Sequence, residues 1–204
     1  MQGAPELVGT RGWTRARALR TAAAAGVAMG AGAALGRRLD AGAAAGPSAG
    51  QDAEILASFL QLEQLQDQFY KAVLRTGRLG GALRQLARTV GPQESEHVRM
   101  LAERVGDRAR PALRPHFDAA LRTQPDALRA AIALEELTIA AYIGQGANLT
   151  RDAIVTVASM VSVEARQAAW LRDLAGEVPA PRPADPSREP DQVVAALRGR
   201  SLIA

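Results

Sequence analysis

The sequence predicts an all-α protein whose core is a bundle of four long helices. Ala, Leu, Arg and Glu, which are good helix formers, dominate the chain, and no stretch alternates between apolar and polar residues as a strand would. Apolar side chains instead recur at helical spacing in four separate segments. The 204 residues include no cysteine, which excludes disulfides, thiolate metal sites and thiol catalysis.

Residues 1–45 are predicted to be an export signal or a disordered leader. The arginine-rich start TRARALR precedes a weakly hydrophobic Ala/Gly run, and the alanines at 43–45 offer a cleavage site. Export to the cell envelope or the extracellular space is the favoured interpretation. The mild hydrophobicity resembles that of twin-arginine signals, although the pair is broken as Arg15-Ala16-Arg17. An uncleaved leader would instead associate with a membrane, although the run is short for a bilayer span.

This leader also accounts for the basic character of the chain. Its six arginines against Glu6 and Asp40 leave a charge of +4, which equals the net charge of the whole protein. The remainder is therefore neutral and has no basic patch, so we expect no nucleic-acid partner.

The bundle is predicted to occupy residues 46–178, followed by a Pro-rich tail over 179–204. Helices are expected at about 52–76, 82–105, 125–143 and 150–175, with a short helix in the tail at 193–197. Thr150 is the expected N-cap of the fourth helix, and Gly91-Pro92 should kink or break the second. The connection over 106–124 is too long for a tight turn and is predicted to hold a short helix.

Four glutamates interrupt the apolar stripes of these helices: Glu63, Glu94, Glu135 and Glu164. An ionised glutamate buried without a partner costs on the order of several kcal/mol, and four that face one another would repel. Either they are protonated or cations lie among them, and two divalent ions would balance the four charges. His97 shares a helical face with Glu94, so a metal ion can take two ligands from one rigid element.

The two halves of the bundle repeat each other. The segment LEQL with Glu63, followed by Tyr70, matches LEEL with Glu135, followed by Tyr142. Nearly equal spacings separate Glu63 from Glu94 and Glu135 from Glu164. Two helical hairpins joined by one long crossover form a four-helix bundle of ferritin-like topology.

Residues 52–176 resemble the ferritin-like domain family that includes exported bacterial proteins and plant desiccation-related proteins. The matching segments are LEQLQDQFY, ESEHVRML, LEELTIAAY and VEARQAAWL. The resemblance implies a dinuclear carboxylate site for two divalent ions, iron or manganese. It assigns Glu63 and Glu135 as terminal ligands, Glu94 and Glu164 as bridging ligands, and His97 as a nitrogen ligand.

Gln167 departs from the family pattern because it occupies the place of a second histidine. Its neutral carbonyl oxygen is a poorer ligand for transition metals than imidazole, so the second ion is expected to bind weakly or not at all. Two functions stay open. The first is a metalloprotein that oxidises iron or handles peroxide or oxygen, and the second is a metal-free bundle with a structural or stress-protective role in the envelope. Catalytic turnover and assembly into a homo-oligomer are left open by the sequence.

Overall fold

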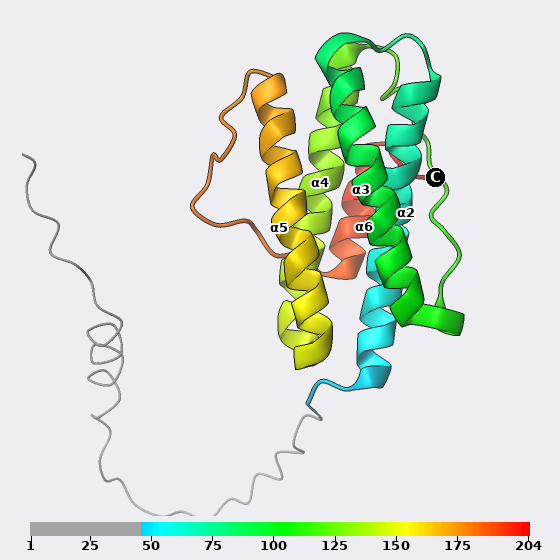
Figure 1. Cartoon of the computed structure of the whole chain (residues 1–204), viewed down its shortest axis with the longest axis vertical. Coiled ribbons are helices and arrows are strands. Elements are labelled where there is room, and N and C mark those ends of the chain that lie inside the picture. The colour runs from blue at the N-terminus through cyan, green and yellow to red at the C-terminus, as the bar shows by residue number, and fades with distance from the viewer. Residues whose placement is uncertain (1–45) are drawn as a thin grey trace, which may run out of the picture. The chain divides into compact units, whose positions relative to one another are not determined.

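The computed structural model describes residues 46–204, which form two long helical hairpins and a short C-terminal helix (Figure 1). The elements in chain order are α2 (Ala49–Arg75), α3 (Gly81–Val105), η1 (Gly106–Arg108), α4 (Gln124–Gln145), η2 (Gly146–Asn148), α5 (Arg151–Leu174) and α6 (Pro190–Gly199). The described part of the chain contains no sheet, which confirms the prediction of an all-α protein. None of these helices combines the length and apolar character that a membrane span needs. The predicted export leader lies outside the described residues.

The helices begin at capping residues that the sequence supplies. Ser48, Thr123 and Thr150 precede α2, α4 and α5, and each side chain accepts a hydrogen bond from a backbone N–H of the first turn. Thr150 is thereby confirmed as an N-cap. It also donates from its backbone N–H and its hydroxyl to the carboxylate of Asp52 on α2, at 2.9 and 2.5 Å. These two bonds tie the second hairpin to the first.

Helix α3 runs without a break through Pro92, so the alternative of a break at Gly91-Pro92 is wrong. Proline removes only one backbone N–H from the helical ladder, and packing on either side compensates. Gly91 is buried, and a Cβ placed there would lie 3.6 Å from the Cβ of Tyr70 on α2. Glu94 and His97 therefore stand on one continuous helix that packs closely against α2.

The crossover between the hairpins holds one short helix in the described part of the chain, the three-residue 3-10 helix η1 at its start, and no helix follows it. Pro111 and Pro115 carry no backbone N–H and interrupt any helical ladder. The crossover pairs with the C-terminal end of the chain instead, because the N–H of His116 donates to the carbonyl of Leu202 at 2.9 Å.

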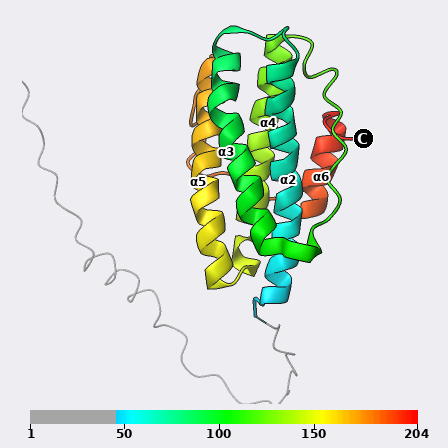
Figure 2. The ribbon, with the colours of Figure 1, turned by 45° about the vertical axis from the view of Figure 1, so that its right-hand side comes forward.

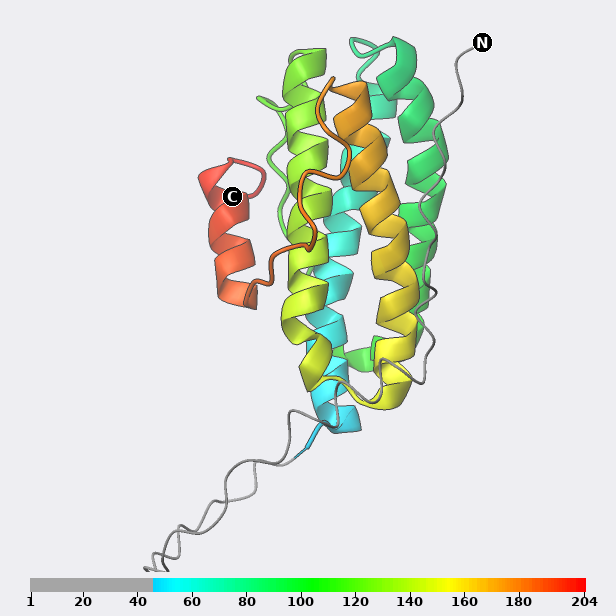
Figure 3. The ribbon, with the colours of Figure 1, turned by 90° about the vertical axis from the view of Figure 1, so that its left-hand side faces the viewer.

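Helix α6 lies outside the hairpins, beside α4 and α2 and on the side away from α5 (Figures 2 and 3). It is longer than the tail helix predicted from the sequence. The segment before it crosses α4 closely, since the N–H of Arg188 donates to the carbonyl of Ala140 at 2.9 Å. Gly144 permits this approach, because a Cβ there would lie only 2.2 Å from the carbonyl oxygen of Arg188.

We therefore expect Gly144→Ala to displace the tail and to lower the free energy of unfolding by about 1–3 kcal/mol, a typical cost of overpacking. Gly146→Ala is the matched control, because Gly146 has helical backbone angles and open space around its Cα. That change should leave stability unaltered or raise it slightly. Thermal unfolding followed by circular dichroism measures both, and equal melting temperatures for the two variants would contradict the expectation.

Candidate metal centre

All six polar side chains predicted to form the site lie inside the bundle. The four glutamates have no exposed surface, and His97 and Gln167 are 5% and 3% exposed. Their helices are α2 for Glu63, α3 for Glu94 and His97, α4 for Glu135, and α5 for Glu164 and Gln167. Each is buried because its apolar neighbours at helical spacing face the core.

Four of the six converge on one point. Ligand atoms of Glu63, Glu94, His97 and Glu164 all lie within 4.8 Å of one another. The Nδ1 atom of His97 is 2.9 Å from Oε1 of Glu164, 3.2 Å from Oε2 of Glu63 and 3.9 Å from Oε2 of Glu94. Three helices thus present one imidazole nitrogen and several carboxylate oxygens to the same volume. This is a donor set that divalent transition metals accept.

Glu94 shows that these residues fit a metal ion. Both of its carboxylate oxygens are buried, and neither has a hydrogen-bond partner within the described part of the chain. A buried carboxylate without a partner costs on the order of several kcal/mol. A divalent cation bound to Glu94 would remove that cost, because it would engage an oxygen to which the imidazole of His97, 3.9 Å away, makes no hydrogen bond.

Burial and mutual repulsion keep protons on the cluster when no metal is bound. Burial, followed by the charge of Glu164, raises the pKa of Glu135 and of Glu94 well above the ordinary glutamate value. The same two causes raise the pKa of Glu63, although its hydrogen bond with His97 lowers it in part. Burial lowers the pKa of His97, but hydrogen bonds with Glu164 and Glu63 outweigh burial and raise it to about 10. A metal ion must therefore displace protons as it binds.

Glu135 lies outside the group of four, and neutral donors satisfy both of its oxygens. Its Oε2 accepts a 2.5 Å hydrogen bond from Nε2 of Gln66, and its Oε1 accepts from the hydroxyl of Tyr70. The same nitrogen of Gln66 lies 3.1 Å from Oε2 of Glu164. No role was predicted for Gln66 from the sequence. The available signal was a polar side chain one helical turn after Glu63, on the same apolar face.

Two tyrosines join the halves of the repeat. Tyr70 on α2 donates to Glu135 on α4, and Tyr142 on α4 donates to Glu63 on α2. Both side chains are fully or almost fully buried. Burial, followed by the charge of the carboxylate that each one contacts, raises the pKa of both tyrosines well above 10.0. They therefore remain protonated donors that orient the two carboxylates.

The side chain of Gln167 makes a hydrogen bond with α3. Its Nε2 donates to Oε1 of Gln93 on α3 at 2.9 Å, whereas its own Oε1 is buried and has no hydrogen-bond partner in the described part of the chain. The amide nitrogen is thus held by α3, and the carbonyl oxygen is not engaged.

A groove between α3 and α5 connects the cluster to the surface. It has a volume of about 420 Å³, and Gln93, His97 and Met100 line it from α3, facing Met160 and Arg166 on α5. Among the six predicted site residues, only His97 lines this groove. An ion or a small molecule that enters the groove therefore meets the imidazole first.

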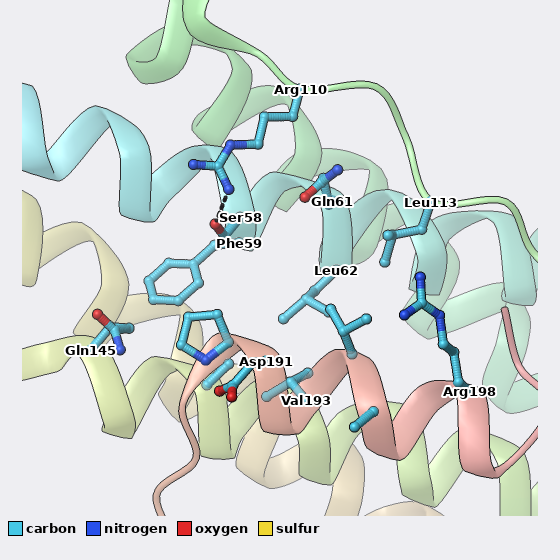
Figure 4. Close-up of a pocket in the computed structure, with 14 residues that line it drawn as sticks. Ser58, Phe59, Gln61, Leu62, Arg110, Leu113, Gln145, Asp191, Val193 and Arg198 are labelled. Carbon is cyan, nitrogen blue, oxygen red and sulfur yellow. Dashed lines mark hydrogen bonds between the residues drawn. The ribbon is translucent and has the colours of Figure 1, made fainter. Parts of the chain in front are cut away.

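A second pocket, of about 350 Å³, lies between α2, the crossover and α6 (Figure 4). Phe59 lines its inner side, and at its edge Arg110 donates to the hydroxyl of Ser58 at 3.0 Å. None of the lining residues belongs to the cluster. The ring of Phe59 packs edge-on against Tyr142, with 4.4 Å between the centroids, and Tyr142 in turn contacts Glu63. This aromatic pair closes the cluster on the side of α6.

The fold and the cluster together define a class of protein: a helical bundle with a buried carboxylate and histidine site. Residues 51–177 match the family model described as a ferritin-like domain. Since the match covers more than half of the 204 residues, the chain belongs to the ferritin-like domain family. A search of curated proteins found no match.

Proposed function

We propose that this protein binds a divalent metal ion, iron or manganese, in the core of the bundle. The observation that carries the proposal is the convergence of Glu63, Glu94, His97 and Glu164, in which the Glu94 carboxylate accepts no hydrogen bond from residues 46–204. Carboxylates favour manganese and similar hard ions, whereas imidazole favours iron and zinc, so the mixed set points to iron or manganese. The ion balances two of the three negative charges, and the hydroxyl of Tyr142 stabilises the carboxylate of Glu63.

Iron or manganese bound there would supply redox chemistry in a volume shielded from bulk water. The protein's own residues would bind this ion and orient its ligand atoms. His97 would bind the ion through a ring nitrogen, and it lines the groove between α3 and α5. Glu94 contributes an oxygen that nothing else engages. We propose that oxidation of iron, or the handling of peroxide or oxygen, is the activity that this arrangement supports.

A metal-free bundle with a structural or stress-protective role is the second candidate. It is favoured by Gln66 and Tyr70, which satisfy Glu135 without any cation. Glu94 argues against it, because no donor among the described residues makes a hydrogen bond to its carboxylate. For either function, export to the cell envelope or beyond remains a prediction that rests on the sequence of residues 1–45.

Elemental analysis of protein purified without added metal, and thermal unfolding with and without chelator, test the proposal. An ion at about 100 times its Kd adds about 2.7 kcal/mol to the free energy of unfolding. Chelation should therefore lower the melting temperature by about 5–10 °C. If the purified protein contains no metal, and neither ferrous nor manganous ion raises the melting temperature, the metal-binding proposal is wrong.

The two histidines offer a matched pair of variants. His97→Ala should weaken binding by more than about 100-fold, because changes even outside the ligand shell cost 10–100-fold. His116→Ala should leave binding unaltered, since His116 is exposed on the crossover.

A further inference from the structure

We propose that this site holds one metal ion rather than two, because the amide of Gln66 occupies the position between Glu135 and Glu164 that a second ion would need. The inference rests on the proposed function and deepens it, since it defines how many ions each chain binds and which residue sets that number. It gives Gln66 the role of a residue that determines the metal stoichiometry.

Gln66 donates hydrogen bonds to two carboxylates at the position where a second cation would bind. Its side chain has no exposed surface. Its Nε2 lies 2.5 Å from Oε2 of Glu135 and 3.1 Å from Oε2 of Glu164, so both amide hydrogens serve carboxylates from two different helices. A second ion bound by Glu135 and Glu164 would compete for the same oxygen lone pairs. A neutral donor thus engages these oxygens inside the protein.

The carbonyl oxygen of Gln66 faces away from the two carboxylates. The hydroxyl of Thr138 donates to Oε1 of Gln66 at 2.7 Å, whereas Nε2 of Gln66 donates to Glu135 and Glu164. Only the carbonyl oxygen of an amide binds a metal ion, and here it points to a hydroxyl on α4. Gln66 consequently blocks the second position without serving as a ligand.

The internal repeat explains why only one half is blocked. Gln66 and Thr138 occupy equivalent positions, one helical turn after Glu63 and Glu135 respectively. Gln66 is long enough to reach the carboxylates of the other half, whereas the shorter Thr138 uses its hydroxyl on Gln66. No amide therefore reaches Glu94, whose oxygens stay without hydrogen-bond partners in the described part of the chain.

A second pair of equivalent positions, His97 and Gln167, favours the same half of the site. His97 lies beside Glu63 and Glu94, which no amide contacts, and its Nδ1 faces Glu63 and Glu164. In the other half Gln167 donates to Gln93. Both asymmetries of the repeat favour a single ion beside His97.

Titration of the metal-free full chain with manganous ion tests this, with calorimetry to count binding events and elemental analysis after gel filtration to count retained ions. The native protein should bind one ion per chain. Gln66→Glu replaces the donating amide with an accepting carboxylate of nearly the same shape, and should bind two. Gln66→Ala removes the amide without adding charge, and should also bind two.

Two control variants should remain at one ion per chain. Gln68→Glu makes the same change on the same helix, where the amide donates only to the backbone carbonyl of Gln64, at 3.0 Å. Gln167→His adds an imidazole while Gln66 stays in place. A native value of two, a value of one in both Gln66 variants, or a value of two in Gln167→His would overturn this inference and leave the proposed function intact. A native value of zero would overturn both.

Discussion

Glu94→Gln should abolish metal binding and at the same time make the metal-free protein more stable. The amide has nearly the shape of the carboxylate but no charge, so the ion would lose one of its three carboxylate ligands. We expect the affinity for manganous ion to fall by more than about 100-fold, beyond the effect of changes outside the ligand shell.

The gain in stability follows from the state of Glu94 without metal. Its two oxygens are buried and have no hydrogen-bond partner in the described part of the chain, and burial raises the pKa of this carboxyl well above its ordinary value. An amide at this position can donate to the neighbouring carboxylate of Glu63 at every pH, whereas the carboxyl of Glu94 can do so only while it holds a proton. Replacing such an unsatisfied group raises the free energy of unfolding by about 1–3 kcal/mol. For a protein of this size, this raises the melting temperature by about 2–4 °C per kcal/mol.

Glu96→Gln is the matched control for this variant. The Glu96 side chain lies on the same helix but is 52% exposed and pairs with Arg99 at 2.5 Å. Its replacement should alter neither metal affinity nor metal-free stability by much, because exposed ion pairs contribute about 0–1 kcal/mol. Thermal unfolding in chelator and titration with manganous ion measure both properties. A Glu94→Gln protein that binds the ion normally, or that melts below the native metal-free protein, would show that Glu94 is not an unpartnered ligand.

Raising the pH should destabilise the metal-free protein and strengthen its binding of metal. Folding raises the pKa of Glu94 and Glu135 above 4.5 and that of His97 from 6.5 to about 10, so the folded protein holds more protons than the unfolded chain. The stabilisation from such groups is complete below the unfolded pKa and is lost as the pH rises toward the folded pKa. Each extra proton held by the folded state removes about 1.4 kcal/mol of unfolding free energy per pH unit.

The window for His97 alone runs from pH 6.5 to about 10, and the loss from the glutamates begins above 4.5. Metal ligands must be deprotonated, so the affinity for manganous ion should rise over the same range. Thermal unfolding of metal-free and manganese-saturated protein between about pH 5 and 9 should give melting temperatures that diverge as the pH increases. A metal-free melting temperature that stays constant or rises across this range would contradict the proton balance described for the cluster.

Helical periodicity alone was enough to predict the four long helices and the burial of the glutamates, because residues on one face of a helix share one environment. The capping role of Thr150 could also be predicted, since a cap depends on local backbone geometry. Local patterns left the outcome open where tertiary contacts decide it. Pro92 stays within a helix that packs against α2, and the crossover pairs with the C-terminal end rather than folding on itself.

Only the tertiary structure decided which of the buried side chains meet. Glu135 and Glu63 are equivalent in the sequence repeat, yet only Glu63 joins His97 in the group of four. Glu135 instead accepts a hydrogen bond from Gln66, whose bonds to Glu135 and Glu164 span 69 and 98 residues of the chain. Periodicity places a residue on a face of its helix, but the partner that a side chain contacts depends on how separate helices pack. For that reason the sequence determined where the carboxylates are buried, and the packing of the helices decided which of them surround the candidate metal centre.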